Sequence, residues 1–238
     1  MSDNFDKTIW ITGASSGIGK ATASKFHSRG YNIIISSRQQ RKLENFAKEI
    51  SNSTSKIHVF PCDFSISSEI DSTSSKIFSQ FNVDCLVNNA AITSFKTAEQ
   101  TTSDEIKNIL NTNLLGAIFA IKNALPYMIK NGGGTIVNVL SVVTHKTFTN
   151  SSVYSASKMG LLGFSNSLRE EVRKHNIRVI NISPGATDTS MWSEKVRSEK
   201  SQMMIRPEEV ADVILWAYEQ NEKLVTEEIL IRPITGDL

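Results

Sequence analysis

Short apolar runs rich in β-branched residues recur along this chain, separated by longer stretches in which apolar and charged positions mix. Apolar runs of about four to eight residues are typical of strands that are buried on both faces of a sheet. Strands are therefore expected at Thr8–Thr12, Asn32–Ser36, Ile57–Phe60, Asp84–Val87, Thr135–Leu140, Ile177–Ile182 and Glu228–Ile231.

The intervening stretches have the spacing of amphipathic helices. One helix follows the first strand and ends near Gly30, and Pro207 opens the last helix as a first-turn proline. The others are expected at Gln39–Ile50, Ser67–Gln80, Thr102–Lys130 and Val153–His175. This alternation predicts an α/β fold with a single doubly wound, Rossmann-like parallel sheet of about seven strands and helices on both faces.

No internal repeat and no low-complexity linker divides the sequence, so residues 1–238 are expected to form one domain. Ser51–Lys56 is interpreted as a loop, and residues 190–205 as an irregular lid over a substrate site. Ligands of doubly wound sheets bind outside the carboxyl ends of the strands, so candidate chemistry is sought there.

Composition narrows the class of protein. Of the 238 residues, 39% are apolar and 21% are charged, as in ordinary globular domains. The net charge of +2 gives no basic surface for nucleic acid, and no apolar run is long enough to span a membrane. Cys62 and Cys85 lack metal-ligand spacing and are interpreted as buried thiols in a reducing compartment, while Met1–Lys7 has no apolar signal core. A cytoplasmic protein without a metal site is expected.

A glycine-rich segment joins the first strand to the first helix. It contains Gly13, Ser15, Ser16, Gly17, Ile18 and Gly19. Glycines at such a junction let the backbone approach a pyrophosphate, which the N-terminus of the helix attracts. The spacing differs from the G-x-G-x-x-G fingerprint of dinucleotide sites, so a simple glycine-rich turn is the alternative.

The end of the second strand indicates which dinucleotide is preferred. Sites for NAD usually place an acidic residue there, against the ribose 2′-hydroxyl. Here Ser37 and Arg38 stand at this position and no carboxylate is nearby. Because a guanidinium can bind a 2′-phosphate through several donors, NADP(H) is predicted over NAD. The alternative is that Arg38 is a solvated charge at the start of a basic helix.

A tyrosine and a lysine four residues apart form the candidate catalytic pair. Tyr154 and Lys158 would lie on one face of a helix, and a nearby ammonium favours the phenolate. A tyrosine tuned in this way can act as a general acid or base. Such pairs also arise by chance on helix surfaces, so the surrounding motifs decide the interpretation.

Taken together, these motifs resemble those of the short-chain dehydrogenase/reductase family over nearly the whole chain. The matching elements are Thr12-Gly13-x-x-x-Gly17-x-Gly19, Asp63, Asn88-Asn89-Ala90-Ala91, Asn113, Ser141, Tyr154-x-x-x-Lys158 and Pro184-Gly185-x-x-x-Thr189. Three positions depart from the family pattern without removing a catalytic group: Ala91 replaces a common glycine, Leu140 a common serine, and Thr187 a valine or isoleucine.

The resemblance implies specific roles. Tyr154 would exchange a proton with the substrate oxygen, Ser141 would orient that oxygen, Lys158 would bind the nicotinamide ribose and lower the pKa of Tyr154, and Asn113 would hold a water. The cofactor would contact Gly13, Ser15, Ser16, Gly17, Ile18, Gly19, Ser37, Arg38, Asp63, Asn89, Ala90, Tyr154, Lys158, Pro184, Gly185, Thr187 and Thr189. The resemblance also implies that the long helices pair between subunits, giving a homodimer or homotetramer.

Substrate choice is expected to depend on residues 93–97, 142–152 and 190–205. Met191 and Trp192 could face an apolar substrate or only pack the lid, and His145 could be a substrate contact or a surface residue. The expected activity is NADP-dependent interconversion of a carbonyl and a secondary alcohol, with a small-molecule ketone or 3-hydroxy acid preferred. A 3-oxoacyl thioester is the alternative substrate, and a non-catalytic NADP-binding sensor is the alternative function.

Overall fold

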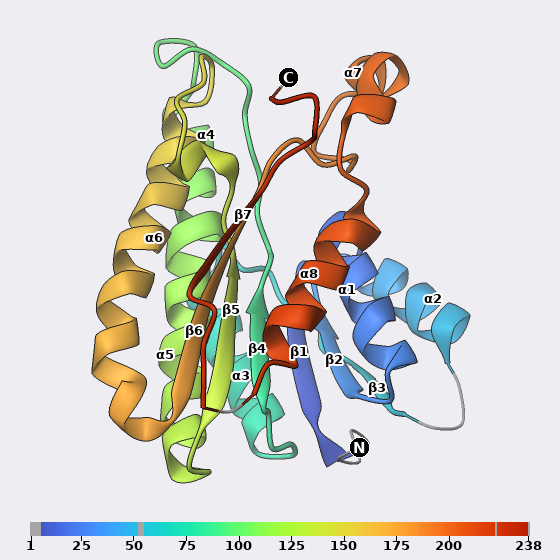
Figure 1. Ribbon diagram of the computed structural model, residues 1–238, viewed down its shortest axis with the longest axis vertical. Helices are drawn as coiled ribbons and strands as arrows, with labels where there is room; N and C mark the ends of the chain where they lie inside the picture. Colours follow the sequence, from blue (N-terminus) through green and yellow to red (C-terminus); the bar gives the residue numbers. More distant parts are fainter. Residues whose placement is uncertain (1–5, 52–54, 222, 238) are drawn as a thin grey trace.

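The computed structural model describes residues 6–51, 55–221 and 223–237, so the segment 1–5 and the centre of the expected loop Ser51–Lys56 lie outside it. Seven parallel strands form one sheet in the order β3-β2-β1-β4-β5-β6-β7, which confirms the predicted architecture (Figure 1). The strands are β1 (Thr8–Thr12), β2 (Asn32–Ser36), β3 (Ile57–Val59), β4 (Cys85–Asn88), β5 (Gly134–Val139), β6 (Ile177–Pro184) and β7 (Glu228–Ile231).

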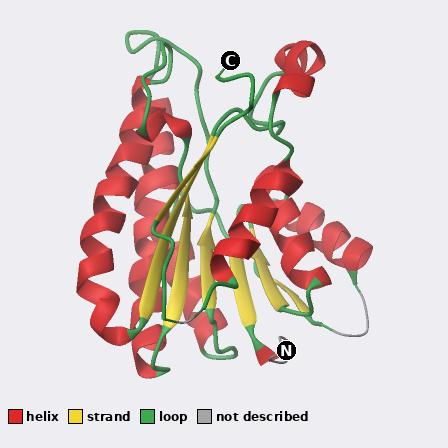
Figure 2. Cartoon of the chain, viewed as in Figure 1, coloured by secondary structure: helices red, strands yellow, loops and turns green. Residues whose placement is uncertain are grey.

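Helices cover both faces of the sheet, as Figure 2 shows. One face carries α1 (Gly17–Ser28), α2 (Gln40–Ile50) and α8 (Pro207–Tyr218), and the other carries α3 (Ser67–Phe78), α5 (Gly116–Lys130) and α6 (Ser152–Val172). Alternate strand residues supply the two cores: Ile9 and Ile11 pack on the first face, and Trp10 between them packs on the second. Fully apolar strands therefore follow from burial on both faces.

The expected long helix Thr102–Lys130 is divided in the structure. It consists of α4 (Ser103–Leu110), a π-helical turn at Asn111–Leu115, and α5. A π turn holds one extra residue per turn and is frequent at functional sites. The sequence pattern missed it because the apolar spacing hardly changes across a single widened turn.

The segment 190–205 is not wholly irregular, contrary to expectation. It contains the short helix α7 (Glu194–Lys200), which begins where the Ser193 hydroxyl accepts a hydrogen bond from the Val196 N–H at 3.3 Å. No residue of α7 is buried, so the apolar periodicity that reveals other helices is absent here. A bridge between Thr187 and Ile205 closes the two ends of this excursion.

Buried asparagines cross the centre of the sheet at one register. Asn88, Asn138 and Asn181 are paired neighbours on β4, β5 and β6. The Asn88 amide donates to the Asn138 oxygen at 2.9 Å, and the Asn138 amide donates to the Ser165 hydroxyl of α6 at 2.9 Å and to the Asn181 oxygen at 3.4 Å. These bonds satisfy most of the polar atoms that the ladder places in the core.

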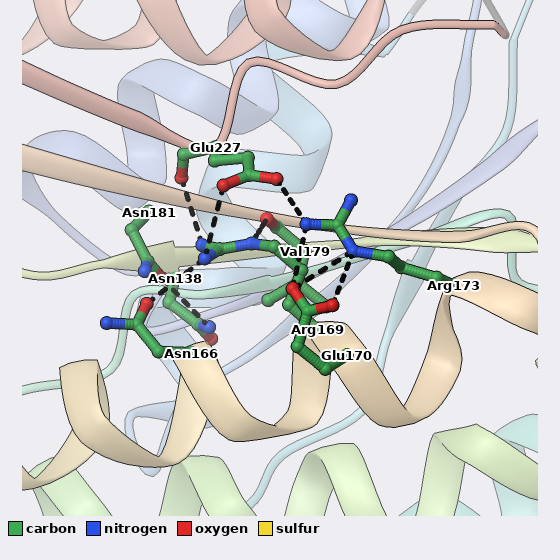
Figure 3. Close-up of polar contacts among 8 residues, drawn as sticks. All are labelled: Asn138, Asn166, Arg169, Glu170, Arg173, Val179, Asn181 and Glu227. Carbon is green, nitrogen blue, oxygen red and sulfur yellow. Dashed lines mark hydrogen bonds and ion pairs between the residues drawn. The ribbon is translucent and has the colours of Figure 1, made fainter.

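Beside this ladder, Arg169 of α6 joins three parts of the fold (Figure 3). Its guanidinium donates to the Val179 carbonyl of β6 at 3.1 Å and to the Glu227 carbonyl at 3.3 Å, just before β7. The Arg169 side chain is only 7% exposed. This buried cation thus anchors the helix that carries Tyr154 and Lys158 to the edge of the sheet.

Candidate active site

The main cavity lies at the carboxyl ends of the strands, where the topology predicts a ligand site. Its volume is about 630 Å³. The predicted residues that line it are Gly13, Ser15, Ser16, Gly17, Ile18, Ser37, Arg38, Asp63, Asn89, Ala90, Ser141, Tyr154, Lys158, Pro184, Gly185, Thr187 and Thr189. Gly19 and Asn113 do not line this cavity, and each lies directly behind it.

The glycine positions of this loop leave no room for a side chain. Gly13 and Gly17 have φ angles of +67° and +53°, in the left-handed region that favours glycine. A Cβ at Gly13 would lie 2.8 Å from the Ala90 Cα, and a Cβ at Gly17 would lie 2.9 Å from the Thr189 Cγ2. Gly13 and Gly17 therefore contribute backbone without side chains to the cavity lining, beside the N-terminus of α1, where an anionic pyrophosphate could approach.

Asn89 fastens this loop to the end of β4. Its side-chain amide donates to the carbonyls of Thr12 at 3.0 Å and Gly13 at 3.2 Å. A Cβ at Gly19 would collide with the same amide and with the Gly13 carbonyl. Gly19 thus serves the site by allowing close packing behind the loop.

The far end of the cavity brings together Ser37, Arg38 and Asp63, which follow β2 and β3. Arg38 is exposed, while the Ser37 hydroxyl is buried and accepts from the Gln39 N–H at 3.2 Å. One carboxylate oxygen of Asp63 accepts from the Ser65 N–H at 2.9 Å, which fixes the turn after β3. The Arg38 guanidinium and the ordered Asp63 carboxylate thus line the predicted adenosine end.

The candidate catalytic groups meet at the other end. Ser141 lies two residues after the end of β5, and Tyr154 and Lys158 lie one turn apart near the start of α6. The Lys158 ammonium donates to the Val139 carbonyl at 2.7 Å and lies 5.9 Å from the centre of the Tyr154 ring. All three side chains line the same cavity, so one substrate oxygen could contact both hydroxyls.

Burial governs the protonation of this pair. Burial raises the pKa of Tyr154 to about 12, although its hydrogen bond with Ser141 opposes the shift. Burial also lowers the pKa of Lys158 to about 8. The pKa of Tyr154 thus lies above the usual value of a phenol, and its lowering by Lys158 stays a prediction. Near neutral pH the phenol keeps its proton and can donate it.

Asn113 sits in the π-helical turn and is almost fully buried. Its amide donates to the Ile92 carbonyl at 2.8 Å and to the Ser157 hydroxyl at 3.1 Å, and its oxygen accepts from the Ile92 N–H at 2.8 Å. The side chain is thus occupied in joining the segment after β4 to α6. The predicted water-holding role stays a prediction.

Pro184 ends β6, and Gly185, Thr187 and Thr189 follow it; all four residues line the cavity. The Thr187 hydroxyl donates to the Gly185 carbonyl at 3.0 Å and thereby fixes this turn. A dinucleotide fits the arrangement, because bare glycine backbone, a helix N-terminus and a cationic fork lie along one continuous cavity that ends at Lys158.

Asp237 also lines the cavity and was not anticipated from the sequence. Its carboxylate is 4% exposed and binds the Lys146 ammonium at 2.9 Å and the Arg232 guanidinium at 2.6 Å. Burial works against ionisation, but these two cations outweigh it and hold the pKa of Asp237 below its usual value. No sequence motif marks this residue. His145, by contrast, is exposed and is not among the described residues that line the cavity.

Comparison with known proteins agrees with this geometry. Residues 7–200 match the family model described as short chain dehydrogenase. The chain is 33% identical to a sepiapterin reductase of Chlorobaculum tepidum, over 97% of each protein. It is 37% identical to carbonyl reductase family member 4 of Xenopus laevis, over 90% of this chain and 92% of that protein.

A solved structure shares the whole fold. A metagenomic short-chain oxidoreductase in complex with NADP superposes with a TM-score of 0.86 at 28% identity, covering 98% of this chain and 99% of that one. The structural match therefore covers nearly the whole chain. The chain belongs to the short-chain dehydrogenase family of oxidoreductases.

Proposed function

We propose that the protein is an NADP-dependent carbonyl reductase, which interconverts a ketone and a secondary alcohol. The observation that carries the proposal is the convergence of Ser141, Tyr154 and Lys158 on the cavity that also contains the glycine loop. The names of the related carbonyl and sepiapterin reductases, and the NADP in the solved short-chain oxidoreductase, support it.

In the reducing direction, bound NADPH supplies the hydride to the carbonyl carbon. Tyr154 gives its phenolic proton to the carbonyl oxygen, which otherwise develops negative charge. The Ser141 hydroxyl donates a hydrogen bond to the same oxygen and orients it. The Lys158 ammonium stabilises the tyrosinate that remains, because an adjacent positive charge favours the phenolate.

The cofactor assignment rests on the end of β2. Ser37 and Arg38 line the cavity there, where NAD enzymes place a carboxylate. An arginine can bind a 2′-phosphate through charge-assisted hydrogen bonds, and a carboxylate would repel that group. This residue pattern supports NADPH as the physiological reductant.

The proposal is tested by measuring NADPH consumption with ketones, 3-oxo esters, 3-oxoacyl thioesters and aldehydes, for the wild type and Tyr154→Phe. We expect turnover of ketones, weaker activity with NADH, and a loss of about a hundredfold or more in kcat in the variant. Calorimetric titration with NADPH is the control, because the phenylalanine variant should still bind the cofactor.

Other results would redirect the assignment. Preferred turnover of thioesters would favour the alternative substrate class. Tight NADPH binding without turnover of any compound would favour a dinucleotide sensor. Full activity in Tyr154→Phe would contradict the proposed proton donor.

A further inference from the structure

Aromatic side chains from three separate segments line the substrate end of the cavity. Phe95 comes from the segment after β4, Phe148 from the segment between Ser141 and α6, and Trp192 from the segment after β6. Met191 lies next to Trp192 and lines the same cavity. The segments expected to choose the substrate therefore contribute apolar, polarisable surface.

Two of these rings are already paired. Phe95 and Trp192 stack with their centroids 4.8 Å apart and their planes 13° from parallel. Phe95 nevertheless remains 48% exposed and Met191 37% exposed, which is unusual for large apolar side chains beside a cavity. Stacked rings leave edges and faces on which a further ring can pack in an offset or edge-to-face arrangement. The pair thus offers a ready surface for a planar group.

The charges around the cavity favour a substrate without a carboxylate. Its charged lining residues within the described chain are Arg38 and Asp63 at the adenosine end, and Lys158 and Asp237. Lys146 and Arg232 are engaged with the Asp237 carboxylate. Apart from Lys158, the described lining at the substrate end supplies no cation for a substrate carboxylate. Burying an unpaired carboxylate there would be costly.

We propose that the substrate end selects uncharged carbonyl compounds that carry an aromatic ring, with the ring packed on the Phe95–Trp192 pair and the carbonyl oxygen at Ser141 and Tyr154. This inference rests on the proposed carbonyl reductase activity and names its substrate class. It disfavours free 3-oxo acids, which the sequence alone left open.

The first experiment compares 1-phenylpropan-2-one with 1-cyclohexylpropan-2-one. A CH2 group keeps each ring out of conjugation with the carbonyl, so the two ketones differ mainly in the aromaticity of the ring. We expect the wild type to prefer the phenyl ketone in kcat/KM by roughly three- to tenfold, the size of one aromatic pair contact. Phe95→Leu and Trp192→Leu keep apolar bulk but remove a ring, so each should reduce this ratio toward one. Trp216→Ala removes an exposed ring on α8 that does not line the cavity, and it should leave the ratio unchanged.

The second experiment compares ethyl 3-oxobutanoate with 3-oxobutanoate, which differ in one negative charge near the reacting carbonyl. We expect the ester to have the higher kcat/KM by at least about tenfold, mainly through KM, because the acid must be desolvated without a free cation. NADPH binding to each leucine variant, measured by calorimetry, shows whether the cofactor site and the fold are intact.

The outcomes separate the inference from the activity on which it rests. Equal kcat/KM for the phenyl and cyclohexyl ketones, an unchanged ratio in both leucine variants, or preference for the free acid would each overturn the inference while leaving carbonyl reduction in place. If no carbonyl compound consumes NADPH, the proposed activity itself fails.

Discussion

At the scale of single residues, Lys158 is a deeply buried charge. It is 2% exposed, and its ammonium donates to one backbone carbonyl at 2.7 Å. A buried ammonium with a neutral partner keeps only part of its hydration energy, which explains why its pKa falls to about 8. The position that makes the lysine useful beside Tyr154 therefore weakens the fold.

The cost of burying the Lys158 ammonium predicts that the difference in stability between the wild type and Lys158→Met depends on pH. Below pH 8 the lysine is charged in both the folded and unfolded states, so the full burial cost is present. Between about 8 and the ordinary value of 10.5, only the unfolded state keeps the proton, so wild-type stability rises with pH. The free energy of unfolding of the wild type minus that of the variant should therefore increase by up to about 1.4 kcal/mol per pH unit in this range.

Denaturant titrations of the free protein and the variant at several pH values from 7 to about 10 measure this difference. Other ionisable groups are common to both proteins and largely cancel. Curves that stay parallel across this range would show that Lys158 does not release its proton on folding.

The predicted residues that are recognisable from the sequence and that line the cavity share one property: their signal lies in local backbone chemistry or in helix spacing. Gly13 and Gly17 are recognisable because their loop needs positive φ angles, and Tyr154 and Lys158 because four residues make one helical turn. Asp237 was missed because only ion pairs with residues distant in sequence, such as Lys146, bring it to the cavity. No local pattern encodes such a contact.

At the scale of elements, Arg169 and Arg173 offer a matched comparison on one helical segment. Both contact Glu227, but the Arg169 side chain is 7% exposed and that of Arg173 is 46% exposed. Arg169 also satisfies the Val179 and Glu227 carbonyls (Figure 3). The two arginines share a partner and differ mainly in burial.

We expect Arg169→Met to lower the free energy of unfolding by about 3 kcal/mol or more, because the Val179 and Glu227 carbonyls lose a donor and the Glu227 carboxylate loses one of its two arginine partners. Arg173→Met should cost at most about 1 kcal/mol, as is usual for exposed ion pairs. Urea denaturation of both variants measures the two values. Similar losses in the two variants would mean that the buried guanidinium does not anchor α6.

Some element boundaries were predictable from the runs of apolar residues and from proline, while those of β4, β5 and β6 differ slightly from the prediction. The bounds of β1, β2 and β7 agree with the sequence prediction, and α8 begins at the predicted Pro207. The π turn at Asn111–Leu115 was not predictable, because it depends on the contacts of Asn113 with Ile92 and Ser157. The exposed helix α7 carries no apolar stripe that could reveal it.

At the scale of the whole molecule, the continuous cavity links stability to the cofactor. A ligand at a hundred times its Kd stabilises the folded state by about 2.7 kcal/mol. For a chain of this size we expect NADPH at that concentration to raise Tm by roughly 5–10 °C. NADH at the same concentration should give a clearly smaller rise, because it lacks the phosphate that Arg38 is proposed to bind.

Thermal denaturation with each cofactor measures the effect, and Arg38→Leu supplies the matched variant. The shift with NADPH should fall toward that with NADH, while the NADH shift stays the same. Equal shifts with the two cofactors in the wild type would contradict the proposed role of Arg38. Within the described residues no helix has the length and apolar character to cross a membrane.

The asparagine ladder has a consequence for how the sheet assembles. Strands β4, β5 and β6 are buried on both faces, and a slip of two residues would keep every side chain on its original face. Such a misaligned sheet would bury almost as much apolar surface as the native one.

Misalignment would, however, separate Asn138 from Asn88 and Asn181, which meet only at the native register. Each amide left without a partner in the core costs about 1–3 kcal/mol. The three asparagines therefore act as an alignment key: they add little to the attraction between the strands, yet they make the competing pairings too costly to persist during folding.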